Sequence, residues 1–403
     1  MTVPAAVPAA TARPAADVVR VVVPRYGEAV IGGAESAMRR LGHALSARGW
    51  EVEVWTTTAL DEATWSSGFA PGLERDGDVV VRRFPVALRR RPWLFRQLSR
   101  AAYHLPRGIR AEHLWSIAQG PYSPALVGAL ARADPVPTIF SPYLFHTTTS
   151  GLPAASHPRI LVPAAHDEPA LRLALVGRAL RSADALWFHS PEERDLVGML
   201  HPQTRGLPSA CGVVGVEVPG TVDRHAFAAR HGITGPYIYH GGRIAGGKGL
   251  ELLSAAAELL HASNPAATAV LSGEAGTGMS TPWLHRVGRL GEAERWEAMA
   301  GAAAIVVPGR LESLSLLALE AWALGRPCLL NAGSPVLAGH AARGGGGLTF
   351  TDARDLAERA GVLIDNPDRA AAMGAAGRAH VAATYRWDLA EHRLRTLLAA
   401  SLR

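Results

Sequence analysis

The sequence predicts an α/β protein made of two similar halves, because the same local unit opens each half. In the first half, the β-branched run 17–23 is followed by a turn-rich loop at 24–33 and a helical pattern at 34–48. In the second half, a short apolar run at 237–240 precedes a glycine-rich loop at 241–249 and a predicted helix at 250–262. A buried strand, a glycine loop and a helix in this order are typical of a Rossmann-like domain with a parallel sheet.

The remaining elements are predicted from apolar runs and helical spacing, with glycine or proline at their ends. Strands are expected at 51–57, 79–84, 138–140, 159–163, 185–189, 267–273, 286–290, 303–307, 328–331 and 348–350. Helices are expected at 292–302, 313–324, 352–365 and 367–384, and a last helix is expected to begin at 385–388. Strands that alternate with helices indicate parallel sheets covered on both faces.

The boundary between the halves is predicted where glycine and proline are frequent, between residues 201 and 220. The chain of 403 residues then divides into a disordered tail at 1–16, an N-terminal domain at 17–210, a C-terminal domain at 211–385 and a final helix at 386–403. This division agrees with the usual size of about 150 residues per domain.

The stretch 308–327, which reads PGRLESLSLLALEAWALGRP, carries a candidate ligand site. Glu312 and Glu320 stand eight positions apart, which is about 12 Å of helical rise, so their carboxylates are expected near one stripe of the helix. The free amides and dipole of the helix N-terminus attract a phosphate. Carboxylates that accept hydroxyl protons beside an anion site suit a sugar nucleotide. The alternative is an ordinary amphipathic helix with two exposed glutamates.

A second candidate site is the loop GGRIAGGKG, which starts at Gly241 and places Arg243 and Lys248 five positions apart. Arginine offers a bidentate fork and lysine a mobile point charge, a pair that suits a diphosphate. The alternative is a surface loop with two ordinary cations.

A histidine, His166, follows the predicted strand 159–163 in the sequence AAHDEP. The carboxyl ends of strands in a doubly wound sheet face the ligand crevice, so His166 is the best cleft residue of the first half. A structural histidine is the alternative at this position.

These motifs together resemble the GT4 family of retaining glycosyltransferases, which have the GT-B fold. The resemblance covers residues 18 to 390 and is carried by the loop ending GGAE at 32–35, the His166-Asp167 pair, the Gly242-Arg243 and Lys248-Gly249 pairs four residues apart, and the 306–327 stretch. The family commonly reads EGFGL where this chain reads ESLSL at 312–316, so serines stand where glycines are usual.

The resemblance implies two Rossmann-like domains facing a central cleft, with the final helix crossing back to the N-terminal domain. It implies that Arg243 and Lys248 hold the donor diphosphate, that Glu320 takes the ribose hydroxyls and that Glu312 contacts the donor sugar. By the same resemblance His166 lies beside the sugar and Gly33 beside the phosphates and the acceptor. Further donor contacts are expected at Gly242, Ser313, Leu314, Ser315 and Leu316.

The expected reaction is transfer of a sugar from a nucleoside-diphosphate sugar to an acceptor hydroxyl, on a glycan, a lipid or a natural product, with retention. No residue stands out as a covalent nucleophile, so transfer on one face is expected. No metal or other cofactor is expected either. The triplet Asp76-Gly77-Asp78 precedes the strand 79–84, at its amino end, whereas doubly wound sheets bind ligands at the carboxyl ends.

Composition bounds the compartment and the partners. Charged residues make up 19% of the chain, and no run of eighteen apolar residues is present. The alanine- and proline-rich start has no basic region before it, so a signal peptide is not expected. Two cysteines far apart, Cys211 and Cys328, fit a reducing cytoplasm. A net charge of +6 suits an acidic donor or an anionic membrane surface without distinguishing them, and no nucleic-acid partner is expected.

The stretch 89–100 mixes arginines with Trp93 and Phe95. A patch for a membrane surface or a lipid acceptor is one interpretation, and a solvated helix face is the other.

Two other functions are compatible with Rossmann-like halves. A nicotinamide-dependent oxidoreductase would need a G-x-G-x-x-G loop and an acidic residue after the second strand, and the first half has neither in good form. A non-catalytic binding subunit would not need Arg243, Lys248 and both glutamates.

Overall fold

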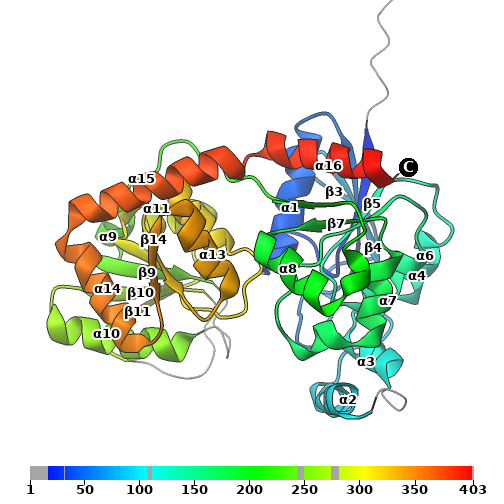
Figure 1. Ribbon diagram of the computed structural model, residues 1–403, viewed down its shortest axis with the longest axis horizontal. Coiled ribbons are helices and arrows are strands. Elements are labelled where there is room, and N and C mark those ends of the chain that lie inside the picture. Colours follow the sequence, from blue (N-terminus) through cyan, green and yellow to red (C-terminus); the bar gives the residue numbers. More distant parts are fainter. Residues whose placement is uncertain (1–16, 31, 107–110, 243–248, 274–280, 402–403) are drawn as a thin grey trace, which may run out of the picture.

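The computed structural model describes residues 17–30, 32–106, 111–242, 249–273 and 281–401. Two α/β domains lie beside each other, each with helices on both faces of a central sheet (Figure 1). The long helices α15 (Pro367–Thr384) and α16 (Trp387–Ser401) run along one side of both domains. The prediction of two Rossmann-like domains with a GT-B arrangement is confirmed.

The first sheet has the strand order β3-β4-β2-β1-β5-β6-β7-β8 within the described residues. All neighbours pair in parallel except β3, which is antiparallel to β4. The strands are β1 (Val18–Val22), β2 (Glu51–Thr57), β3 (Gly72–Asp76), β4 (Val79–Phe84), β5 (Thr138–Phe140), β6 (Arg159–Leu161), β7 (Ala185–Phe188) and β8 (Ser209–Cys211).

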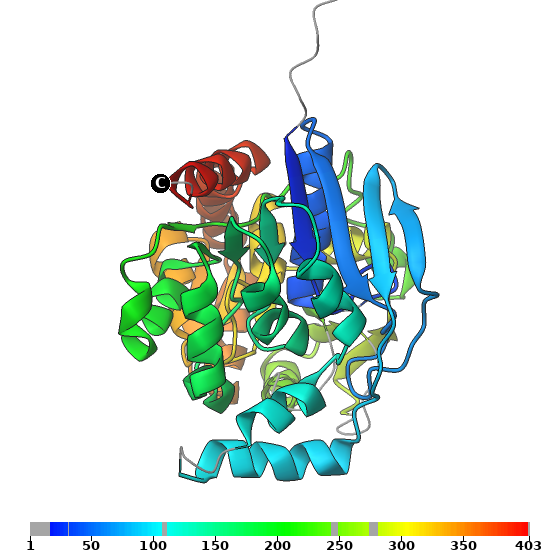
Figure 2. The same cartoon turned by 90° about the vertical axis from the view of Figure 1, so that its right-hand side faces the viewer.

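The helices of this domain cover both faces of the sheet and its lower end (Figures 1 and 2). They are α1 (Gly33–Ser46), α2 (Pro92–His104), α3 (Glu112–Gln119), α4 (Pro124–Leu130), α5 (His146–Thr149), α6 (Gly151–Ala154), α7 (Ala174–Ser182) and α8 (Pro191–Leu200). Short 3-10 turns lie at Pro169–Arg172 and Pro202–Thr204.

The second sheet has the order β11-β10-β9-β12-β13-β14, and its pairings are all parallel. Its strands are β9 (Tyr237–Gly241), β10 (Thr268–Ser272), β11 (Leu284–Gly288), β12 (Ala304–Val307), β13 (Cys328–Asn331) and β14 (Gly347–Phe350). The helices are α9 (Ala226–Arg230), α10 (Leu250–Ser263), α11 (Glu292–Gly301), α12 (Leu316–Ala323), α13 (Pro335–Gly344) and α14 (Ala353–Asp365).

The structure differs from the elements predicted from the sequence in three places. The polar stretch before β4 is itself a strand, β3, which forms a hairpin with β4 through the Gly77 turn at φ 61°. The stretch 201–220 is not loop throughout, since β8 extends the sheet at its edge. The helix expected over 313–324 begins three residues later, at Leu316, so Glu312 is not on it.

Each sheet reverses its order of strands next to its first strand, which creates a switch point. The chain winds outward from β1 through β2 and returns to the other side of β1 with β5, and it does the same around β9 with β12. Loops that follow parallel strands at a switch point diverge and leave a crevice for ligands. The loops after β1, β9 and β12 carry Gly33, Gly242 and Glu312, so the fold places these predicted residues at the two crevices.

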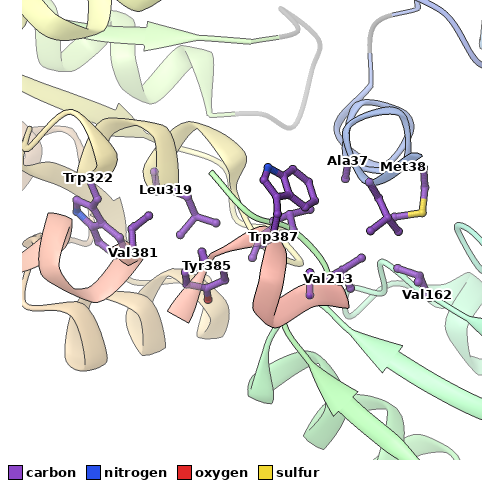
Figure 3. Close-up of a cluster of buried hydrophobic side chains, with 14 of the residues drawn as sticks. Ala37, Met38, Val162, Val213, Leu319, Trp322, Val381, Tyr385 and Trp387 are labelled. Atoms are coloured by element: carbon purple, nitrogen blue, oxygen red, sulfur yellow. The ribbon is translucent and has the colours of Figure 1, made fainter. Parts of the chain in front are cut away.

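A shared apolar core holds the crossover between the domains (Figure 3). Leu319 and Trp322 of α12 and Val381 of α15 lie on one side of it, and Met38 of α1 lies on the other. Trp387 stands between them at the start of α16 (Figure 3). The chain at Gly215 packs closely on Trp387, and only glycine fits there, since a Cβ would lie 2.5 Å from the backbone nitrogen of Trp387.

The last helix is fastened to the N-terminal domain by polar contacts. The Trp50 indole donates to Glu391 Oε1 at 3.1 Å, and the Arg393 side chain donates to the Gly212 carbonyl at 3.2 Å. The predicted return of this helix to the N-terminal domain is therefore observed.

The β3–β4 hairpin gives a test of stability against pH. Asp76 accepts from Arg39 Nε at 2.6 Å and lies 2.9 Å from His43 Nε2. The hydrogen bond from Arg39 is the main reason why the pKa of Asp76 is lowered to about 2. A carboxyl whose pKa is depressed by folding stabilises the protein above its unfolded pKa of about 4, and this contribution is lost as the pH falls toward 2.

We therefore expect Asp76→Asn to lower the free energy of unfolding by about 1 kcal/mol at pH 7, allowing for solvent screening. The difference from wild type should disappear near pH 2. Urea unfolding of both proteins at several pH values measures it, and an equal difference at all pH values would contradict the ion-pair explanation.

Candidate active site

The loop from β12 to α12 starts the helix through a strained residue. Ser315 is the N-cap of α12, with φ 70° and ψ 85°, and its hydroxyl accepts from the Ala318 nitrogen at 3.5 Å. A left-handed backbone is unfavourable for residues other than glycine. Ser315 stands at the second glycine position of the family's EGFGL sequence, so the usual glycine has a conformational reason. The cap explains why the helix begins at Leu316.

Glu312 lies in this loop, half-buried, ahead of the helix N-terminus. Its carboxylate folds back toward Gly309, where an added Cβ would lie 2.7 Å from Glu312 Oε1. Ser313 and Leu316 are half-buried, and Leu314 and Ser315 are buried. The loop 308–315 carries residues that the sequence predicts to bind the donor, and we call it the donor loop. It is a compact turn at the amino end of α12, where free amides favour an anion.

Glu320 is a buried carboxylate held by arginines from both domains. Its side chain is 2% exposed, and it pairs with Arg295 of α11 at 2.5 Å and with Arg40 of α1 at 2.7 Å. Burial by itself would raise the pKa of Glu320, but Arg295 and then Arg40 outweigh it and lower this pKa. Glu320 is therefore an anion that faces the N-terminal domain.

The glycine loop after β9 meets the same region. Gly249, the residue after Lys248, has φ 75° and packs against Pro308 so closely that a Cβ would lie 2.9 Å from the Pro308 carbonyl carbon. Glycine is therefore required here on two counts. Gly242 follows β9 and donates to the Ser272 carbonyl at 3.1 Å. Arg243 and Lys248 lie outside the described residues.

On the N-terminal side, Gly33 is the first residue of α1, and a Cβ there would meet nothing within 4 Å. The space that a side chain at Gly33 would occupy is therefore free of other described residues. The buried Arg25 braces the loop before it, donating to Glu35 Oε1 at 2.7 Å and to Glu62 Oε2 at 3.1 Å.

His166 lies on the loop after β6, at the carboxyl edge of the sheet, and is half-buried. In this loop Ala164 has φ 52°, a strained backbone conformation for alanine. The buried Glu193 of α8 holds it, because its carboxylate accepts from the Ala165 nitrogen at 2.7 Å and from the His189 nitrogen at 2.6 Å. Burial raises the pKa of Glu193 to about 8, although the hydrogen bonds from the backbone donors act to lower it. Glu193 is thus a positioning residue for His166.

The structure brings Glu320 against α1, the helix that begins at Gly33, and Gly249 against the donor loop. It adds residues that sequence reasoning missed, namely Arg40, Arg295, Glu193 and His240. His240 is buried at the end of β9, with Nδ1 2.9 Å from the Val306 carbonyl. Of these four residues, only His240 has a signal in the sequence, because it stands just before the glycine loop.

Comparison with protein families covers most of the chain. Residues 32–207 match a family described as glycosyl transferase 4-like domain, and residues 248–399 match one described as glycosyl transferase-like. The chain is a GT-B glycosyltransferase of the GT4 type. These matches favour the glycosyltransferase over the nicotinamide-dependent oxidoreductase.

Among curated proteins, this glycosyltransferase is similar to the GDP-mannose-dependent monoacylated alpha-(1-6)-phosphatidylinositol monomannoside mannosyltransferase of Corynebacterium glutamicum. The two are 30% identical over 222 residues, which is 49% of this chain and 56% of that enzyme. The match therefore spans little more than half the length of that relative.

Solved structures share the fold across nearly the whole glycosyltransferase. Sucrose-phosphate synthase from Thermosynechococcus elongatus has a TM-score of 0.70 at 19% identity, over 95% of this chain and 100% of that one. HepE from Anabaena in complex with UDP-glucose has a TM-score of 0.67 at 15% identity, over 95% and 99%. WaaG, a glycosyltransferase involved in lipopolysaccharide biosynthesis, has 0.62 at 16%, over 95% and 99%.

The strain at Ser315 gives a direct test. Glycine at this position removes a cost of about 1–2 kcal/mol for the left-handed backbone and loses only a few tenths as an N-cap. Alanine keeps the strain and loses the cap, which costs about 1 kcal/mol. We expect Ser315→Gly to be at least as stable as wild type and Ser315→Ala to be less stable. Urea unfolding of the three proteins measures this, and a glycine variant weaker than the alanine variant would contradict it.

Proposed function

We propose that this chain transfers a sugar, with retention, from a nucleoside-diphosphate sugar to an acceptor hydroxyl. The observation that carries the proposal is the contact of Arg40 with Glu320 at 2.7 Å. It joins the helix after the first glycine loop to the helix after the donor loop, so loops from both switch points border one cleft. A donor bound there reaches groups from both domains.

In the proposed complex, the ribose hydroxyls donate to the Glu320 carboxylate. Arg295 keeps that carboxylate charged and oriented, and Arg40 gives up its place to the ribose. Glu312 contacts hydroxyls of the donor sugar, and the Ser313–Leu316 turn offers its amides to phosphate oxygens. The names of two similar proteins support this donor class, since one is GDP-mannose-dependent and another is in complex with UDP-glucose.

In the proposed reaction, the bond between the anomeric carbon and the diphosphate oxygen breaks while the acceptor oxygen bonds to the same face of that carbon. Arg243 and Lys248 hold the diphosphate and stabilise its growing negative charge. The leaving phosphate oxygen takes the acceptor proton, so atoms and charge balance without a covalent enzyme intermediate. His166, fixed through Glu193, lies beside the sugar, and Gly33 leaves room for the acceptor.

The two glutamates test this assignment. Because the ribose belongs to the free nucleotide and the sugar does not, Glu320→Gln should weaken binding of the nucleoside diphosphate about 10-fold or more, the effect of one charged hydrogen bond. Glu312→Gln should leave that binding nearly unchanged and slow donor turnover instead. Calorimetry with UDP and GDP, together with turnover of the matching sugar donors, measures both effects.

The reverse pattern would show that the two roles are exchanged. Because Glu320 pairs with two arginines, thermal unfolding of Glu320→Gln is needed to check that this variant remains folded. Intact nucleotide binding with no donor turnover in the wild-type chain would favour the non-catalytic binding subunit.

We further propose that the reaction needs no metal ion, because Arg243, Lys248 and a helix N-terminus supply the positive charge. The one Asp-x-Asp triplet at 76–78 is built into the β3–β4 turn, where Asp76 already pairs with Arg39 and His43. We expect EDTA to leave transfer essentially intact in a standard turnover assay. Loss of turnover in EDTA that manganese or magnesium restores would refute this proposal.

A further inference from the structure

One surface of the N-terminal domain has a concentrated positive charge. Between Asp78 and Glu112 the chain has no acidic residue, although its net charge as a whole is only +6. The same stretch contains the arginines Arg82, Arg83, Arg89, Arg90, Arg91, Arg96, Arg100, Arg107 and Arg110. Such an imbalance within one short segment favours a negatively charged partner.

Some of these arginines have structural roles. Arg83 pairs with Glu74 at 2.5 Å, and Arg82 lies over the Trp55 ring at 5.2 Å. Arg90 donates to the Gln119 carbonyl and lies over the rings of Trp65 and Phe95. These contacts hold the start of the segment onto the domain.

Four others have no such role. Their side chains are exposed, and no ion pair to a carboxylate is observed for them in the described part of the chain. They are Arg89, Arg91, Arg96 and Arg100. Their charge is available to a partner.

The helix α2 presents this charge together with an aromatic ring. Its inner face packs on α3, where Phe95 and Tyr103 contact Trp115 and Ser99 accepts from the Trp115 indole at 3.1 Å. Trp93, Arg96 and Arg100 are spaced i, i+3 and i+7, so they share the opposite, outer stripe.

Large apolar side chains are also exposed in this segment. Trp93 is 59% exposed, and Leu88 and Leu94 of the same segment are 54% and 38% exposed. Exposed apolar groups in the same segment as these arginines indicate contact with a partner that is both anionic and apolar.

The position of α2 connects this surface to the cleft. The helix follows β4, and β4 runs parallel to β1 and β6. It therefore lies on the side of the sheet where these strands end, which also carries the loops of Gly33 and His166. Figure 2 shows α2 along the lower border of the molecule, outside the other helices. No helix in the described residues is long and apolar enough to cross a membrane.

We infer that the outer face of α2 and the preceding loop, residues 88–100, docks on an anionic lipid bilayer. The arginines pair with lipid phosphates, and Trp93 with Leu88 and Leu94 enters the interface between head groups and acyl chains. The cleft edge then faces the bilayer, which delivers a lipid-borne acceptor hydroxyl. This last step rests on the proposed transferase function, whereas the docking itself does not.

The test is co-sedimentation of the full chain with vesicles of phosphatidylcholine alone and of phosphatidylcholine with about a third phosphatidylglycerol. We expect binding only to the anionic vesicles, weaker at high salt. Arg96→Glu with Arg100→Glu should weaken it 10-fold or more, and Trp93→Ala should weaken it several-fold at unchanged net charge. The matched control is Arg354→Glu with Arg369→Glu, two exposed arginines of the other domain, which should bind like wild type.

Three results would overturn the inference: no binding to anionic vesicles, equal losses in the two double variants, or an unchanged affinity in Trp93→Ala. Thermal unfolding and calorimetry with nucleoside diphosphate confirm that the α2 variants remain folded with an intact donor site. Vesicle binding without donor turnover would refute the proposed function and leave the docking surface standing.

Discussion

The buried carboxylate of Glu320 is the constraint on which the cleft depends. An ionised group with 2% exposure needs charged partners, because desolvation without them costs several kcal/mol. Arg295 comes from the same domain and Arg40 from the other, so the requirement for pairing also links the two domains. In the proposed donor complex, a ligand that binds Glu320 through hydroxyl groups would replace Arg40 and so weaken this link.

The helix that carries Glu320 is fixed at both ends. At its start, the left-handed Ser315 turns the chain so that the loop and the helix amides face one crevice. At its end, the Trp322 indole donates to the Gly346 carbonyl at 2.7 Å, and its ring packs so closely on Gly377 that a Cβ there would not fit. The same apolar core continues to Trp387, so α12 and α16 pack on one continuous core.

The N-terminal domain places two features at the carboxyl ends of its parallel strands. The loops after β1 and β6 face the cleft, while the chain after β4 leaves the same edge to form α2. Since all these strands are parallel, their outgoing loops share one side of the sheet. Under the proposed function, an acceptor held at a surface contacted by α2 would therefore lie on the same side of the sheet as Gly33 and His166. The cationic surface of α2 and the loops of the candidate active site thus both follow from one topology.

The two Rossmann-like halves, their glycine loops and the places of Gly33, His166 and Gly242 after strands could be predicted from the amino-acid sequence, as could the helix that carries Glu320. These depend on local patterns, since β-branched runs, helical spacing and glycine turns act within a few residues of each other. The remaining features could not be predicted from local patterns. The edge strands β3 and β8 are short and polar and form by pairing with a neighbour, and α12 starts late because of a backbone angle at Ser315. Arg40 and Glu320 are 280 positions apart, and no local pattern links them; packing of the two domains makes them a pair.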